Sequence, residues 1–112
     1  MKKENIGLDI VEVKRFATIN SRSKVHLLKK LFTDSEITYC TSFKDPSSHL
    51  AGLFAAKEAV SKALGVNLFP FVEIEIRHDK EGAPEAWYRN KKLPVKVSIT
   101  HTKTLAAAVA LS

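Results

Sequence analysis

The sequence predicts an α+β fold in which a mainly antiparallel sheet packs against one long helix and shorter helices. Two observations lead to this class. Apolar residues recur at helical spacing through residues 24–65, whereas apolar and polar residues alternate through residues 72–99. A chain of 112 residues is also the size of one domain, so we expect a single domain over residues 1–112.

The first third of the chain predicts a strand followed by short helices. Ile6 to Val11 is apolar and β-branched around Asp9, which indicates a buried strand that leads into a helix near Glu12. Lys24 to Phe32 has the apolar spacing of a helix, and Thr33-Asp-Ser-Glu36 matches the capping box that begins another one.

The longest predicted element begins at Asp45 and ends before Gly65. Asp45 is a suitable N-cap, Pro46 suits the first helical position, and Gly65 suits the residue just past a helix end. Nothing in the sequence between them interrupts the helical pattern.

The second half of the chain predicts strands. Apolar and polar residues alternate with the period of two that is typical of half-buried strands, and the chain ends in an apolar run. Residues 79–82 have the composition of a turn. These strand-like segments are Val72 to Ile76, Ala86 to Arg89, Val95 to Ile99 and Leu105 to Leu111.

Composition predicts a soluble globular protein, with 45% apolar and 27% charged residues. No apolar run approaches the roughly 20 residues needed to cross a bilayer. Cys40 is the one cysteine, so it has no internal disulfide partner, and we interpret it as a packing residue. A cytoplasmic protein is expected.

The net charge of +6 predicts polyanionic partners such as nucleic acid, phosphorylated cofactors or acidic proteins. Much of the excess lies in the first third of the chain. The residues are Lys14, Arg15, Arg22, Lys24, Lys29 and Lys30.

The segment FAAKEAVSKALG, residues 54–65, combines a carboxylate and an ammonium on one predicted helix face. Glu58 and Lys62 are four residues apart, and Asp9 is an unusual charge within an apolar strand. Two carboxylates together with substrate phosphate are how Mg²⁺ is usually held. Spacing alone slightly favours the alternative, in which Asp9 caps the next helix and Glu58 pairs with Lys62 or Lys57 on a solvated face.

His101 lies in the polar cluster SITHT, where an imidazole and hydroxyls can contact a phosphate or a nucleobase. A structural role is the alternative. His26, His49 and His78 have no supporting constellation, so we expect them at the surface. Neither a Walker loop nor a GxGxxG segment is present.

Taken together, these segments resemble one enzyme family. GLDIVEVKR, LFTDSE, HLAGLFAAKEAVSKALG, the Gly82-Ala83-Pro84 segment, SITHT and the Ala-rich end occur in the order found in the holo-acyl-carrier-protein synthases. That family is the short, homotrimeric type of 4′-phosphopantetheinyl transferase. The resemblance covers nearly the whole chain and implies the fold of these transferases.

The resemblance implies a role for each matching position. Asp9 and Glu58 match the Mg²⁺-binding carboxylates, and Lys62 matches the lysine that contacts the diphosphate of coenzyme A; these three form the catalytic set. His101 and Thr102 match the pair near the 3′-phosphorylated adenosine. Gly82 and Pro84 match a segment that holds the nucleotide from the neighbouring chain, because the family's site lies between subunits.

The carrier-protein contacts match less closely. Arg15, Arg22 and Lys24 correspond to the basic surface that grips the acidic helix of the carrier protein. The sequence also departs from the family at Leu53, where arginine is common. A basic contact to coenzyme A is then missing, unless Lys57 or another cation substitutes for it.

The implied reaction moves the phosphopantetheine arm of coenzyme A onto a serine of an apo-acyl carrier protein and releases 3′,5′-ADP. It depends on Mg²⁺, serves fatty acid biosynthesis, and needs a general base, for which Glu58 is the first candidate. Two alternatives stay open: a catalytically silent relative that only binds carrier protein, and a small basic nucleic-acid-binding module. The second explains the charge but not Asp9 or Glu58.

Overall fold

The computed structural model describes residues 4–17, 22–65 and 70–112, with the side chains of residues 22–24 left out. Its helices and strands follow one another as β1 (Ile6–Glu12), α1 (Arg22–Leu31), α2 (Asp34–Thr41), α3 (Pro46–Leu64), β2 (Ile74–His78), β3 (Pro84–Tyr88), β4 (Lys91–Lys92), β5 (Lys96–His101) and β6 (Leu105–Leu111). Two 3₁₀ helices complete them, η1 (Val13–Phe16) and η2 (Phe71–Glu73).

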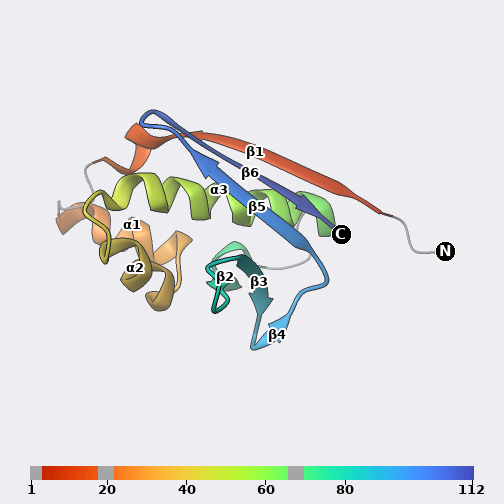
Figure 1. Cartoon of the computed structure of the whole chain (residues 1–112). Helices are drawn as coiled ribbons and strands as arrows, with labels where there is room; N and C mark the ends of the chain where they lie inside the picture. The colour runs from red at the N-terminus through yellow and green to blue at the C-terminus, as the bar shows by residue number, and fades with distance from the viewer. Residues whose placement is uncertain (1–3, 18–21, 66–69) are drawn as a thin grey trace.

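The strands form two antiparallel sheets, and α3 lies between them. One sheet has the order β1-β6-β5 and the other β2-β3-β4. Figure 1 shows the first sheet along one side of α3, with α1, α2 and the second sheet on the other side. The predicted class, a mainly antiparallel α+β fold around one long helix, is confirmed.

Most predicted boundaries are confirmed, and the capping signals explain why. Thr33 Oγ1 accepts from the Glu36 backbone N–H while Glu36 Oε1 accepts from the Thr33 backbone N–H, which is the complete capping box. Asp45 Oδ1 accepts from the Ser47 backbone N–H at the start of α3, and Gly65 caps its end.

Strands β3 and β5 differ from their predicted bounds by up to two residues, and β4 was not predicted, but two other elements differ in kind. The helix expected near Glu12 is only the four-residue η1. The strand expected from Val72 begins at Ile74, because Phe71–Glu73 forms η2 instead.

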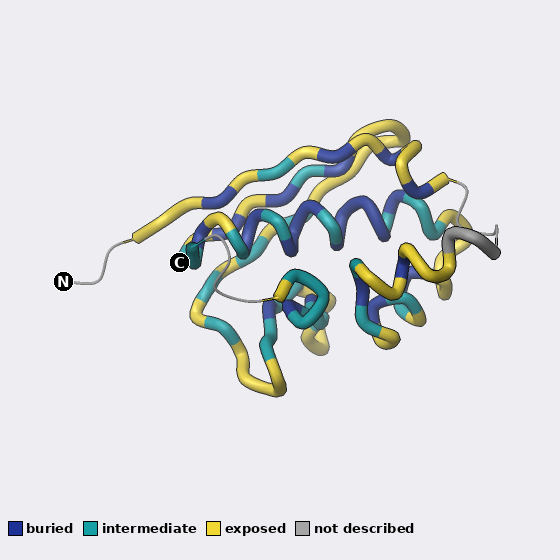
Figure 2. Tube along the Cα trace, turned by 180° about the vertical axis from the view of Figure 1, so that it is seen from behind, coloured by how far each residue is buried: buried dark blue, intermediate teal, exposed yellow. Residues whose placement is uncertain are grey.

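The core is built on α3, whose alanines allow close packing on both sides. Ala55, Ala56, Ala59 and Val60 are all fully buried, and Figure 2 shows α3 as the most buried stretch of the chain. Cys40 is also fully buried, as expected of a packing residue, and burial raises the pKa of its thiol to about 12.

One ion pair is buried completely within this core. Lys57 Nζ lies 2.7 Å from Glu36 Oε1 and also donates to the Leu31 carbonyl, while Glu36 Oε2 accepts from the Ile76 backbone N–H. Burial raises the pKa of Glu36 and lowers that of Lys57, and their mutual attraction opposes both shifts. The pair therefore ties α1, α2, α3 and β2 together.

Candidate active site

The close approach of β1 to α3 brings Asp9 and Lys62, two of the predicted catalytic residues, together. A Cβ added at Gly7 would lie 1.9 Å from the Ala59 carbonyl oxygen, so only glycine allows this contact. Alternation along β1 turns Gly7 and Val11 inward, and Asp9 has the same orientation toward α3. Asp9 therefore faces the helix that carries Glu58 and Lys62.

Lys62 is the partner of Asp9. Its Nζ lies 3.5 Å from Asp9 Oδ1 and donates to the Leu8 carbonyl oxygen at 2.9 Å. The Asp9 side chain is 19% exposed and Lys62 is 48% exposed, so the pair remains open to solvent. An ammonium held beside a half-buried carboxylate at an accessible edge can meet an anionic substrate.

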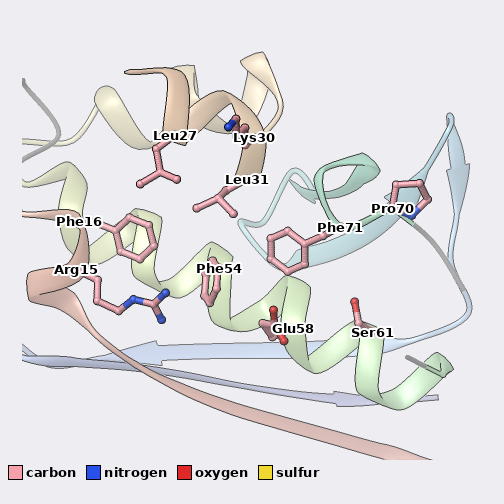
Figure 3. Close-up of a pocket in the computed structure, with 10 residues that line it drawn as sticks. All are labelled: Arg15, Phe16, Leu27, Lys30, Leu31, Phe54, Glu58, Ser61, Pro70 and Phe71. Carbon is pink, nitrogen blue, oxygen red and sulfur yellow. The ribbon is translucent and has the colours of Figure 1, made fainter. Parts of the chain in front are cut away.

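Glu58 opens onto a cavity of about 780 Å³ between α3, η1, α1 and η2. The cavity has an apolar wall and a few polar groups, which are shown in Figure 3: Arg15, Phe16, Leu27, Lys30, Leu31, Phe54, Glu58, Ser61, Pro70 and Phe71. Within the described part of the chain, the Glu58 side chain makes no ion pair or hydrogen bond.

The solvated-face alternative for these carboxylates is therefore wrong. Lys62 pairs with Asp9 and Lys57 pairs with Glu36, so neither lysine neutralises Glu58. Asp9 is no helix cap either, since Glu12 holds the N-cap position of η1.

Arg15 lies in the same cavity as Glu58. Its guanidinium carbon is 5.0 Å from the centre of the Phe54 ring, which is a cation–π contact. Arg22 and Lys24 stand at the start of α1, and their side chains lie outside the described residues.

The predicted nucleotide residues gather in a second cavity, of about 200 Å³. Gly82, Pro84 and His101 all line it, and Leu53 contributes to its wall while being only 3% exposed. Gly82 has a φ of +87°, which closes the turn around Asp79 and favours glycine. Thr102 lies just beyond His101, with its hydroxyl oxygen accepting from the Leu105 backbone N–H.

Sequence reasoning missed two histidines at this cavity. His49 and His78 also line it, so the expectation of surface histidines without a constellation is wrong for both. Their rings pack against Phe43 and Tyr39, and the apolar spacing of α2 and α3 holds no signal for such a contact. His26 is exposed on α1, as expected.

The two cavities lie on opposite sides of α3. At about 100° per residue, positions 54, 58 and 61 face one way, whereas positions 48, 49 and 52 face roughly the other way. We name the side of α3 with Glu58 the carboxylate wall, and the side with His101, which is predicted to bind nucleotide, the nucleotide wall. Within one chain, α3 separates the two.

Comparison with known proteins identifies the family. Residues 5–111 match the model of the 4′-phosphopantetheinyl transferase superfamily. The chain belongs to this superfamily.

Relatives within the superfamily have the expected name. The chain is 45% identical over 109 residues to the holo-[acyl-carrier-protein] synthase of Bacillus subtilis, covering 92% of this chain and 89% of that protein. It is 40% identical over 119 residues to the same enzyme of Thermoanaerobacter sp. strain X514, covering 96% and 85%.

Solved structures of these transferases have the same fold. The Helicobacter pylori holo-[acyl-carrier-protein] synthase in complex with coenzyme A is 34% identical, with a TM-score of 0.79 over 96% of this chain and 99% of that one. The Bacillus anthracis enzyme, in complex with CoA (3′,5′-ADP), is 31% identical with a TM-score of 0.78 over 96% and 93%. The resemblance to the holo-acyl-carrier-protein synthases is confirmed.

Proposed function

We propose that this chain transfers the 4′-phosphopantetheine arm of coenzyme A to a serine of an apo-acyl carrier protein, releasing 3′,5′-ADP, as one domain over residues 1–112. The observation that carries the proposal is the 3.5 Å pairing of Asp9 with Lys62 at the β1–α3 contact, one helical turn from Glu58 at its cavity, in a chain of this superfamily. The product serves fatty acid biosynthesis, and we expect the enzyme to act in the cytoplasm. No helix in the described part of the chain is long and apolar enough to cross a membrane.

Asp9 and Glu58 fit a Mg²⁺ ion that is shared with substrate. Both offer hard oxygen ligands from facing elements, and no group of three potential protein ligands occurs among the described residues. Two carboxylates that leave the remaining positions to water and phosphate suit Mg²⁺ rather than a metal enclosed by protein. When bound, the ion would supply positive charge that stabilises the diphosphate of coenzyme A while the bond between the attacked phosphorus and the leaving 3′,5′-ADP oxygen breaks.

The remaining chemistry is assigned to the chain's own side chains. Glu58, which has no neutralising partner among the described residues, accepts the proton of the carrier serine hydroxyl. The serine oxygen then bonds to the phosphorus of the phosphopantetheine arm, and the bond from that phosphorus to the oxygen of 3′,5′-ADP breaks. Lys62 contributes positive charge to the diphosphate, where negative charge accumulates.

The acidic carrier protein is expected to dock at the basic entrance to the Glu58 cavity. Arg15 lines this cavity from η1, and α1, which begins at Arg22 and includes Lys24, forms its edge. A carrier bound there would bring its serine toward Glu58. Arg15 thus lies in the same cavity as the proposed general base Glu58 and not on the outer surface alone.

A homotrimer with sites between subunits would bring the two separated walls together. His101, Thr102, Gly82 and Pro84 of one subunit would meet Lys62 of the next. The outer face of the β1-β6-β5 sheet supports association, because it exposes large apolar side chains. These are Ile6, Leu8, Ile10, Leu105, Val109 and Leu111, between 39% and 70% exposed.

The test is arm transfer followed by intact-protein mass spectrometry. Purified protein, coenzyme A, Mg²⁺ and apo-carrier protein should give a carrier heavier by one phosphopantetheine arm. Asp9→Asn and Glu58→Gln should each lower the rate by at least about 10²–10³-fold, since each removes an electrostatic contact to the reacting groups. Glu12→Gln, on the same strand but exposed beside Lys14, is the matched control.

Two results would contradict the proposal. A wild-type protein that leaves the carrier unmodified would be a silent relative instead of an enzyme. Full activity in both carboxylate variants would remove the metal assignment.

A further inference from the structure

Three imidazoles from three elements converge on the 200 Å³ cavity. His49 comes from the first turn of α3, His78 from the end of β2 and His101 from the end of β5. The rings of His49 and His101 are 5.4 Å apart, centre to centre, at an angle of 66°. The cavity therefore has an imidazole lining contributed by both sheets and α3.

Stacking holds two of these rings in place. Phe43 stacks on His49 with centres 3.6 Å apart and 13° between the planes, and Tyr39 stacks on His78 at 4.2 Å and 9°. Stacking fixes a ring through its face and leaves its edge nitrogens available. Within the described residues, no hydrogen bond or ion pair engages a ring nitrogen of the three histidines.

Among the described residues of this chain, no lysine or arginine lines this cavity. Leu53 occupies the wall, and Lys57 is held in the core by Glu36. Lys57 is therefore no substitute for the arginine that is missing at position 53. An anion bound here would depend on histidine for positive charge.

Burial lowers the pKa of both His49 and His78, which favours their neutral form until an anion arrives. Burial lowers the pKa of His49, the nearby His101 and His78 lower it further, and Asp45 at the N-cap of α3 opposes them. Burial likewise lowers the pKa of His78, against the opposing charge of Asp79. The remaining titratable group at the cavity is the Tyr39 phenol from α2, whose pKa burial raises, so it stays uncharged.

We propose that His49 and His78 join His101 in a protonation-dependent site for a phosphomonoester, which in this enzyme is the 3′-phosphate of coenzyme A. The inference rests on the proposed function and extends it to two residues and a pH dependence. A bound dianion supplies the counter-charge that the cluster lacks, so binding draws a proton onto the imidazoles. Affinity for the phosphomonoester should consequently rise as the pH falls toward the ordinary imidazole range.

The test compares two ligands that differ only in this phosphate. Coenzyme A and dephospho-coenzyme A are titrated into the full-length protein by calorimetry, with the same Mg²⁺ concentration, at about pH 6.5 and about pH 8. Coenzyme A should bind about tenfold more tightly at the lower pH, because one proton taken up changes affinity by up to tenfold per pH unit. Dephospho-coenzyme A should show no such gain.

Variants assign the effect to the cluster. His49→Gln and His78→Gln should each reduce the gain at low pH, and the loss should be confined to coenzyme A. His78→Lys should give tight binding of coenzyme A at both pH values, since its charge no longer titrates in this range. His26→Gln, on the exposed face of α1, is the matched control and should bind as the wild type does.

The possible outcomes distinguish a failure of this inference from a failure of the proposed transferase function. An equal pH response for both ligands would overturn the inference alone, because the cluster would then sense the diphosphate or no phosphate at all. An equal loss of both ligands in the glutamine variants would also overturn it. A wild-type protein that binds neither ligand would overturn the proposed function as well.

Discussion

Lys57 and Lys62 belong to the same helix but to opposite environments. Lys57 is fully buried against Glu36, with a 2.7 Å ion pair, whereas Lys62 is half-exposed beside Asp9. Lys57 therefore supports the structure of the core, and Lys62 is the lysine that we propose to contact substrate.

A substitution at each lysine should separate these two roles. Lys57→Met leaves the carboxylate of Glu36 buried without its cation, so we expect a loss of about 3–5 kcal/mol in the free energy of unfolding. Lys62→Met removes an exposed charge and should cost under about 1 kcal/mol, although it should abolish arm transfer. Urea denaturation followed by circular dichroism measures the difference, and equal losses would contradict the assignment of Lys57 to the core.

The sequence could identify Asp9 and Glu58 as candidate site carboxylates, but it could not show which side chains each lysine of α3 would pair with. Asp9 is conspicuous as a charge in an apolar strand, and Glu58 lies at helical spacing from Lys62. Which lysine turns inward depends on what packs against each face of α3, and spacing within one helix holds no such information. The stacking of His49 and His78 depends likewise on α2 and β2 meeting in space.

The contact between β1 and α3 is the element on which the site depends. The Ala59 carbonyl lies so close to Gly7 that any side chain there would force the helix away from the strand. Because Asp9 lies on β1 and Glu58 and Lys62 lie on α3, the distance between these two elements sets the geometry of the site.

Gly7→Ala should therefore disrupt both the fold and the site. We expect destabilisation of about 3 kcal/mol or more, since the obstacle is backbone that cannot move aside. Gly52→Ala is the matched control, because its added methyl would meet only the side-chain Cγ2 of Ile99, at 3.0 Å. Thermal unfolding of the two variants checks this. A Gly7→Ala protein as stable as Gly52→Ala would show that the close contact between β1 and α3 does not require glycine at position 7.

Elements with local end signals were predictable, and those shaped by distant contacts were not. The capping box at Thr33 and the Asp45-Pro46 start act within one turn, so the sequence alone locates α2 and α3. Val72 alternates with its neighbours as a strand residue does, yet its carbonyl accepts from Lys57 and the segment forms η2. The division of the strands into two sheets likewise depends on long-range pairing.

The whole molecule has one face that suits association. The outer side of the β1-β6-β5 sheet exposes Leu8 and Ile10 at 63% and 64%, while the inner side packs on α3. The two walls proposed to bind coenzyme A lie on opposite sides of α3, so we propose that a second subunit unites them.

A charge on the outer face should prevent assembly. Leu8→Lys places an ammonium on the apolar surface without changing the inner side of β1, so we expect a folded monomer with little transfer activity. Val25→Lys, at an exposed position on α1, should leave the assembly intact. Size-exclusion chromatography with light scattering distinguishes the two, and an unaltered Leu8→Lys trimer would place the interface elsewhere.

The most direct test of a shared active site is complementation between two inactive subunits. Glu58→Gln lacks the carboxylate wall and His101→Ala lacks part of the nucleotide wall, so each variant alone should transfer little or no arm. In co-expressed mixed trimers, about a quarter of the sites should combine two intact walls from neighbouring subunits. Mass spectrometry of the carrier protein should then show transfer restored toward a quarter of the wild-type rate, whereas mixed assemblies as inactive as their parents would contradict a site built between subunits.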